Sequence, residues 1–147
     1  MSNLEDLPNA TQAILIDQDM SGPSPEHIAG VFQRYADLFT AGDAKGITAL
    51  YAPDAVVRDP VTGPEVRGSQ AIHDWYQRAF DTAGRMFMEL EGEVRVGGRY
   101  GAAAYVVRVV DQPEPFRSNT LDVMVFNDDG LIVSMDAYWG PTNIHKL

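Results

Sequence analysis

The sequence predicts an α+β fold in which three helices cover one face of a strongly curved, antiparallel or mixed β-sheet. Two observations support this class. Up to about residue 82, apolar residues recur with the 3.6-residue period of amphipathic helices. From Arg85 onward they alternate with polar residues in runs separated by short turn sequences, as in half-buried strands.

The three helices are expected between recognisable start and stop residues. The first begins at Ser24 and ends at Gly42, because serine caps helix starts and glycine ends helices. The second begins at Asp43, stops before Pro53, and carries on one face Ile47, Leu50 and Tyr51. The third is capped by Ser69, and its inward face is expected to hold Ile72, Trp75, Tyr76, Ala79 and Phe80.

Five strands are expected. A short one covers residues 55–59 and ends at Pro60, which cannot donate to a ladder. Four longer ones cover residues 86–96, 100–111, 116–127 and 131–139, and Gly97-Gly98 forms a hairpin turn between the first two of these. Residues 1–22 are polar and acidic apart from one apolar run, so they are interpreted as an N-terminal arm preceding a single domain of residues 23–147.

Composition limits the function classes. The net charge is −10, which argues against nucleic acid and anionic membranes as partners. The chain has no cysteine, which excludes disulfides, thiolate metal sites and cysteine nucleophiles. No apolar run approaches the roughly 18 residues of a membrane span, so we expect a soluble cytoplasmic protein.

Asp59 is the first candidate for chemistry. On a period of two it shares a face of its strand with Ala55 and Val57, while Arg58 alternates to the other face. A carboxylate in that position either faces an apolar pocket or initiates a turn before Pro60.

Asp122 is the second unusual acid. It lies within the expected strand 116–127, on the same face as Thr120, Met124 and Phe126. The residue is either exposed on a wet face or buried. If it is buried without a cation, its pKa rises, and the neutral acid donates a hydrogen bond.

Tyrosines form the third group, since Tyr35, Tyr51 and Tyr76 each fall on the inward face of a different expected helix. They are either separate core aromatics or members of one hydroxyl network. The three histidines lie far apart without metal-ligand spacing, and no phosphate-binding glycine loop is present. We therefore expect acid–base chemistry by carboxylates and phenols, without metal or cofactor.

Several of these residues together resemble the bacterial Δ5-3-ketosteroid isomerases. The resemblance extends over about residues 25–143 and is carried by Asp59-Pro60, Leu50-Tyr51-Ala52, Trp75-Tyr76, Leu121-Asp122-Val123-Met124 and Ala137-Tyr138-Trp139. The spacings fit as well, with 24 residues from Tyr35 to Asp59 and 63 from Asp59 to Asp122. The resemblance implies a cone-shaped fold like that of nuclear transport factor 2, with a deep apolar pocket, and a homodimer.

The resemblance also implies roles. Asp59 corresponds to the general base, Tyr35 and Asp122 to the oxyanion hole, and Tyr76 and Tyr51 to phenols that support Tyr35; these isomerases are a known case of a neutral acid donating to an oxyanion. The residues expected to line the pocket are Trp75, Met124, Phe126 and Trp139. The implied reaction moves a C=C bond of a 3-ketosteroid from the β,γ to the α,β position. Alternatives are an epoxide hydrolase or polyketide cyclase of the same fold, commonly with an Asp–Arg–Asp set holding water, or a non-catalytic binding module.

Overall fold

The computed structural model describes residues 3–147 of the chain. In that range the α-helices are α1 (Asn9–Leu15), α2 (Pro25–Ala41), α3 (Ala44–Thr48) and α4 (Ser69–Ala83). The strands are β1 (Tyr51–Arg58), β2 (Val66–Arg67), β3 (Met86–Gly97), β4 (Tyr100–Val109), β5 (Phe116–Phe126), β6 (Ile132–Tyr138) and β7 (Ile144–Lys146). Two single 3₁₀ turns lie at Leu4–Asp6 and Pro141–Asn143.

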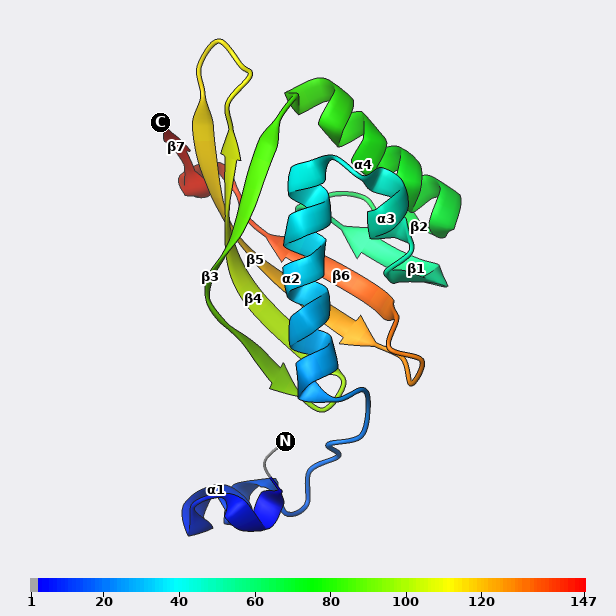
Figure 1. Cartoon of the computed structure of the whole chain (residues 1–147), viewed down its shortest axis with the longest axis vertical. Coiled ribbons are helices and arrows are strands. Elements are labelled where there is room, and N and C mark those ends of the chain that lie inside the picture. The colour runs from blue at the N-terminus through cyan, green and yellow to red at the C-terminus, as the bar shows by residue number, and fades with distance from the viewer. Residues whose placement is uncertain (1–2) are drawn as a thin grey trace.

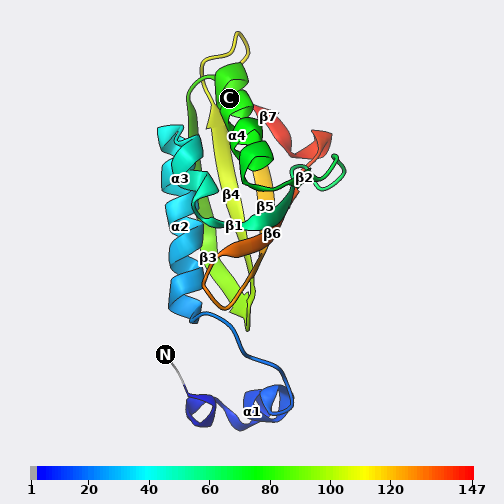
Figure 2. The same ribbon diagram turned by 90° about the vertical axis from the view of Figure 1, so that its right-hand side faces the viewer.

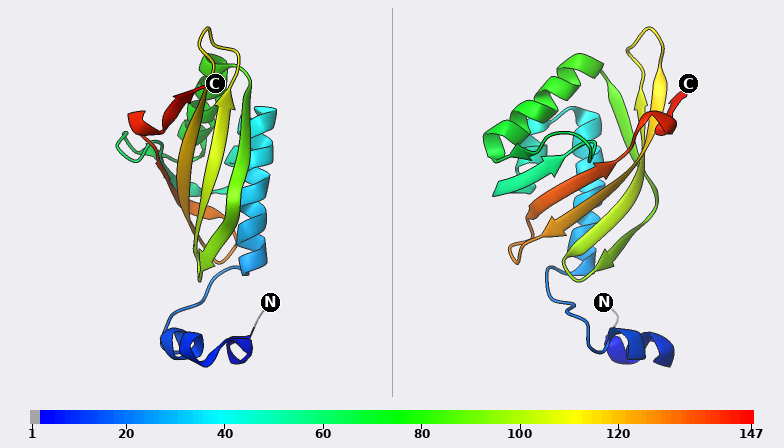
Figure 3. Two further views of the ribbon diagram at one scale, coloured as in Figure 1. Left: turned by 90° about the vertical axis from the view of Figure 1, so that its left-hand side faces the viewer. Right: turned by 180° about the vertical axis from the view of Figure 1, so that it is seen from behind.

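All seven strands belong to one curved sheet with the order β2-β1-β6-β5-β4-β3, and β7 pairs with β5. The β1–β6 pair is parallel and the other pairs are antiparallel. Helices α2, α3 and α4 lie on one face of the sheet (Figures 1 and 2), and the opposite face has no helical cover when the molecule is seen from behind (Figure 3). The predicted α+β architecture is confirmed.

The helix ends follow largely from capping chemistry. The Ser24 hydroxyl accepts a hydrogen bond from the His27 amide at 3.0 Å, and Asp43 accepts one from the Gly46 amide at 2.8 Å. Gly42 ends α2 with a φ of +66°, a left-handed conformation that favours glycine. The cap predicted at Ser69 is wrong, because the N-cap of α4 is Gly68 and Ser69 is already helical.

The second predicted helix is shorter than expected, and Tyr51 is not on it. Helix α3 ends at Thr48, and Tyr51 opens strand β1 opposite Ile132 of β6. Pro53 biases Ala52 toward extended geometry, and pairing with Ile132 of β6 places Tyr51 in the strand. The β1–β6 pairing is irregular between Tyr51 and Val56, so the proline lies in a stretch that needs no regular ladder.

Strands β3 to β6 lie where the alternation predicted them, although three of them end one or two residues earlier. The short strands β2 and β7 were not predicted, since runs of two or three residues carry no measurable period. After β6, the turn at Pro141–Asn143 interrupts the edge, and β7 then pairs with Phe116, Arg117 and Ser118 of β5. Strand β7 therefore extends the sheet along the first part of β5.

The first part of the chain contains α1, which lies away from the sheet in all the views of the whole chain (Figures 1–3). Residues 1 and 2 of the predicted arm lie outside the described residues. The arm reaches the domain beside the β3–β4 turn, where a Cβ added to Gly22 would lie 2.9 Å from Arg99. We propose residue 22 as the boundary. None of the described helices is long and apolar enough to cross a membrane.

Candidate active site

Asp59 follows the last residue of β1 and faces the helix-covered side of the sheet. Its neighbour Arg58 points to the opposite side, where two hydrogen bonds of 2.7 and 2.9 Å join its guanidinium to Asp136 of β6. This arrangement agrees with the predicted alternation. The chain therefore places the Asp59 carboxylate on the inside and the arginine with its ion pair on the outside.

The Asp59 carboxylate has one side-chain partner among the described residues. The indole Nε1 of Trp139 donates a hydrogen bond of 2.6 Å to Asp59 Oδ1. Burial raises the pKa of Asp59, and the bond from Trp139 opposes that shift without cancelling it. A carboxylate with a raised pKa is a better base than a free aspartate, as proton abstraction from carbon requires.

A cavity of about 300 Å³ opens in front of Asp59. The predicted pocket residues Trp75 and Trp139 belong to its wall, whereas Met124 and Phe126 do not. Both of these are fully buried in the hydrophobic core, and Tyr35 and Asp122 are likewise buried and absent from the lining, so the contact of these four residues with a ligand stays a prediction. The cavity lining consists of Phe39, Asp59, Trp75, Ala79, Ala83, Met86, Val107, Val109, Phe116, Ser118, Trp139 and Ile144. Asp59 and Ser118 are the only side chains in this set with polar groups other than the Trp indoles.

Three phenols form one hydrogen-bonded chain behind this wall. The hydroxyl of Tyr76 on α4 lies 2.8 Å from that of Tyr35 on α2 and 2.8 Å from that of Tyr51 on β1. The structure thus joins all three predicted tyrosines, although Tyr51 arrives from a strand. Since each hydroxyl has one proton, the order Tyr51 to Tyr76 to Tyr35 leaves the Tyr35 proton for a further acceptor.

Burial, together with the charges of Asp59 and Asp122, raises the pKa of Tyr35 well above its ordinary value. Burial is also the main cause that raises the pKa values of Tyr51 and Tyr76. All three phenols are therefore protonated near neutral pH. Phe39 links Tyr35 to the cavity, because it lines the wall and its ring centroid lies 6.1 Å from that of Tyr35.

Asp122 lies on the inward face of β5 with 2% of its surface exposed. Burial raises its pKa well above the ordinary value, the charge of Asp59 adds to this shift, and a 3.0 Å bond from the Thr120 hydroxyl to Oδ1 opposes it. The buried reading of Asp122 is the correct one. Thr120 was not singled out from the sequence, although its position two residues before Asp122 on one strand face was a usable signal.

Asp122→Asn is expected to flatten the pH dependence of stability. A raised folded pKa means that the stabilisation is complete below the unfolded value near 3.9 and declines as pH rises toward the folded pKa. In that interval the wild type should lose up to about 1.36 kcal/mol per pH unit relative to Asp122→Asn. Urea titrations of both proteins between pH 4 and 7 measure this difference. Parallel curves would mean that Asp122 is ionised.

Trp139→Phe is expected to move the acid limb of the pH–rate profile to higher pH. The variant keeps an aromatic ring in the cavity wall but removes the donor that lowers the pKa of Asp59. A base acts only when it is deprotonated. In any reaction in which Asp59 is the base, a higher pKa of Asp59 therefore moves the rise of kcat/KM to higher pH. Rates measured from pH 4 to 8 test this expectation, and an unmoved limb would contradict it.

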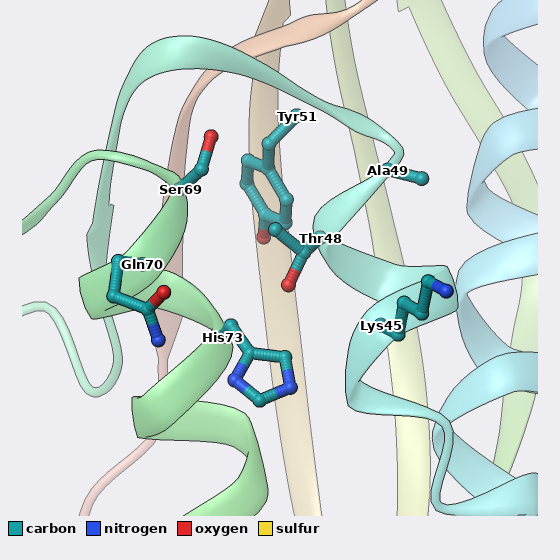
Figure 4. Close-up of a pocket in the computed structure, with 7 residues that line it drawn as sticks. All are labelled: Lys45, Thr48, Ala49, Tyr51, Ser69, Gln70 and His73. Atoms are coloured by element: carbon teal, nitrogen blue, oxygen red, sulfur yellow. The ribbon is translucent and has the colours of Figure 1, made fainter.

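A second cavity, of about 430 Å³, lies between α3 and the start of α4 (Figure 4). Its polar lining includes Lys45, Thr48, Ser69, Gln70 and His73, and Tyr51 forms part of the wall. Tyr51 therefore belongs both to the wall of this cavity and to the phenol chain. Within residues 3–147 no three His, Asp or Glu side chains gather as metal ligands would, and the nearest partner of His73 is Asp74 at 3.1 Å.

Comparison with known proteins bears on the family and the fold of the chain. Residues 32–135 match the family model of the SnoaL-like domain. The steroid Delta-isomerase of Nocardioides simplex is 37% identical over 110 residues, which cover 74% of this chain and 85% of that protein. The solved structure of the epoxide hydrolase/cyclase-like enzyme SalBIII, which acts in pyran ring formation in salinomycin, superposes with a TM-score of 0.74 at 23% identity. That match covers 83% of this chain and 97% of SalBIII.

Proposed function

Because the chain belongs to the family of SnoaL-like domains, we propose that it is a steroid Δ-isomerase that acts on a Δ5-3-ketosteroid. The observation that carries the proposal is the position of Asp59. Its carboxylate faces an apolar cavity, and its charge contributes to the raised pKa values of the buried Tyr35 and Asp122. A base beside two neutral donors is the set that enolisation of a ketone requires.

The proposed reaction has two proton transfers. Asp59 removes a proton from C4, between the carbonyl and the C5=C6 bond, and the electron pair passes into a dienolate whose charge lies on the C3 oxygen. Tyr35 and Asp122 donate hydrogen bonds to that oxygen. The protonated Asp59 then returns the proton to C6, and the electrons re-form the carbonyl with the double bond now between C4 and C5. The proton that leaves is the one returned, so no net acid or base is consumed.

Each residue in this scheme has a physical reason for its role. The Tyr51–Tyr76–Tyr35 chain of hydrogen bonds orients the Tyr35 proton toward the C3 oxygen. The bonds from Tyr51 and Tyr76 polarise the Tyr35 hydroxyl, which helps it to stabilise the negative charge on that oxygen. Thr120 occupies Oδ1 of Asp122, which leaves the proton of the neutral acid for Oδ2 and the ligand. Trp139 holds Asp59 in place without protonating it.

Hydrolase or cyclase chemistry is the second candidate, because the fold is shared with SalBIII. The expected Asp–Arg–Asp set would require an arginine beside Asp59. Arg58 instead pairs with Asp136 on the outer face, and Arg108 pairs with Glu89 at 2.7 Å. These pairings favour the isomerase, and the presence of a base with two protonated donors argues against a purely binding module.

Ultraviolet spectroscopy tests the proposed function. Addition of the protein to 5-androstene-3,17-dione should produce the absorbance of a conjugated enone, with no metal or cofactor added. An unchanged spectrum at high protein concentration would refute the isomerase. The same protein should then be tested with an epoxide, where consumption of the epoxide would support the second candidate.

A homodimer is also part of the proposal. The uncovered face of the sheet exposes apolar side chains, and two of them, Leu121 and Tyr138, are directly paired across β5 and β6 with 43% and 49% of their surfaces exposed. A second copy of the chain packed on this face would remove them from water. Sedimentation equilibrium measures the mass. Leu121→Lys should shift a dimer toward the monomer, and a monomeric wild type would refute this part of the proposal.

A further inference from the structure

The inward face of β5 carries a row of polar side chains that the catalytic roles do not fully use. Side chains alternate between the two faces of a strand, so Ser118, Thr120 and Asp122 share this face with Phe116, the first residue of β5. Thr120 is bound to Asp122, whereas the Ser118 hydroxyl has no hydrogen-bond partner among residues 3–147. Ser118 is half-buried and lines the apolar cavity, so its hydroxyl is accessible to a ligand, and a ligand that covered it with hydrocarbon alone would do so at a cost in free energy.

Strand register places Ser118 in the middle of the wall. It lies opposite Val107 of β4 on one side and Ile144 of β7 on the other, and all three side chains line the cavity. Four residues of β5 separate Ser118 from Asp122, so at about 3.3 Å per residue the two side chains are roughly 13 Å apart. That separation is comparable with the length of a fused four-ring skeleton.

We propose that Ser118 is a specificity-determining residue that hydrogen bonds to an oxygen substituent on the ring farthest from the reacting carbonyl. The inference rests on the proposed function, which places the C3 oxygen at Tyr35 and Asp122. From that anchor the rings extend past Asp59 along β5, toward Val107, Phe116 and Ile144. The preferred substrates are therefore 3-ketosteroids with a hydroxyl or keto group on the D ring, rather than steroids with only hydrocarbon there.

The preference for an oxygenated D ring arises because the two kinds of ligand leave the Ser118 hydroxyl in different states. An oxygenated D ring gives the Ser118 hydroxyl a partner, whereas a hydrocarbon D ring removes water from the hydroxyl and supplies none. Phe116 and Val109 provide apolar packing for either ligand. The difference in affinity between the two ligands therefore measures the contribution of the Ser118 hydroxyl. A net hydrogen bond of this kind corresponds to a preference of about two- to tenfold.

The test uses two phenolic steroids with the same A ring, estradiol and its 17-deoxy analogue, as mimics of the dienolate. With the wild type, calorimetry should give a Kd for estradiol about two- to tenfold lower than the Kd for the 17-deoxy analogue. With Ser118→Ala the ratio of these two Kd values should be near one. Ser134→Ala is the matched control, because Ser134 lies on β6 outside the cavity lining and should leave the ratio unchanged.

Three other results would overturn the inference. Equal affinities with the wild type would show that Ser118 makes no such bond. Equal losses for both ligands with Ser118→Ala would assign Ser118 to packing alone, and in both cases the isomerase proposal would stand. Failure of both steroids to bind would refute the proposed function and the role of Ser118 together.

Discussion

Asp59→Asn is expected to lower kcat by about 10²–10⁴-fold, the range typical of general-base catalysis. The amide keeps the shape of the carboxylate and the acceptor for Trp139, but it cannot take a proton from carbon. The cavity should therefore stay intact while the chemistry fails. Stopped-flow measurement of enone formation gives kcat, and calorimetry with estradiol gives ligand affinity, which should remain within about tenfold.

A matched control for this substitution lies on β1, the strand that precedes Asp59. Asp54→Asn makes the same chemical change on an exposed side chain of β1, away from the cavity lining, and should retain the wild-type rate. A wild-type rate for Asp59→Asn would remove Asp59 from the role of base. Loss of estradiol binding together with turnover would instead indicate a collapsed cavity, which circular dichroism and denaturant titration would detect.

Tyr35→Phe is expected to lower kcat by about 10²–10³-fold, the usual cost of one oxyanion donor, with a much smaller change in KM. The phenol binds the ground-state carbonyl weakly and the dienolate oxygen strongly, so its loss falls on the transition state. The substitution also leaves the chain of Tyr51 and Tyr76 without its final member. Steady-state kinetics on the same Δ5-3-ketosteroid measure both constants.

Tyr105→Phe provides the control for this second prediction. The Tyr105 hydroxyl is equally buried but donates to the Phe32 carbonyl at 2.7 Å, outside the phenol chain. Its removal should cost about 1 kcal/mol of stability and leave kcat nearly unchanged. If Tyr35→Phe changed only KM, or if both variants lost the same activity, the oxyanion role of Tyr35 would fail. Asp122→Leu, which removes the second donor, should lose more activity than Asp122→Asn.

Much of the fold followed from short-range patterns. The period of two placed Asp122 on the inward face of β5 and Arg58 opposite Asp59, because strand parity is a local property. The alternation along a strand shows which face a residue occupies, but it does not show how deeply that residue is buried. Met124 and Phe126 share the face of Asp122, and the three side chains are all buried, which the alternation alone does not reveal because it depends on how the helices cover the sheet.

Tertiary contacts explain the other differences. Tyr51 follows α3 by three residues, and its assignment to β1 depends on pairing with Ile132 of β6, which lies 81 residues later. The bond between Trp139 and Asp59 likewise joins positions 80 residues apart. Strand β7 exists only because the turn at Pro141–Asn143 returns the chain to β5. No local pattern in the sequence contains these relationships.

The position of Arg58 on the uncovered face has an evolutionary consequence. Adjacent residues of a strand point to opposite sides, so a shift of one residue in β1 would carry the arginine inward and the aspartate outward. The irregular stretch between Tyr51 and Val56 is where an insertion or deletion would be absorbed at least structural cost. A single codon gained or lost there would place the side chain of Arg58, in place of that of Asp59, on the cavity side of the sheet.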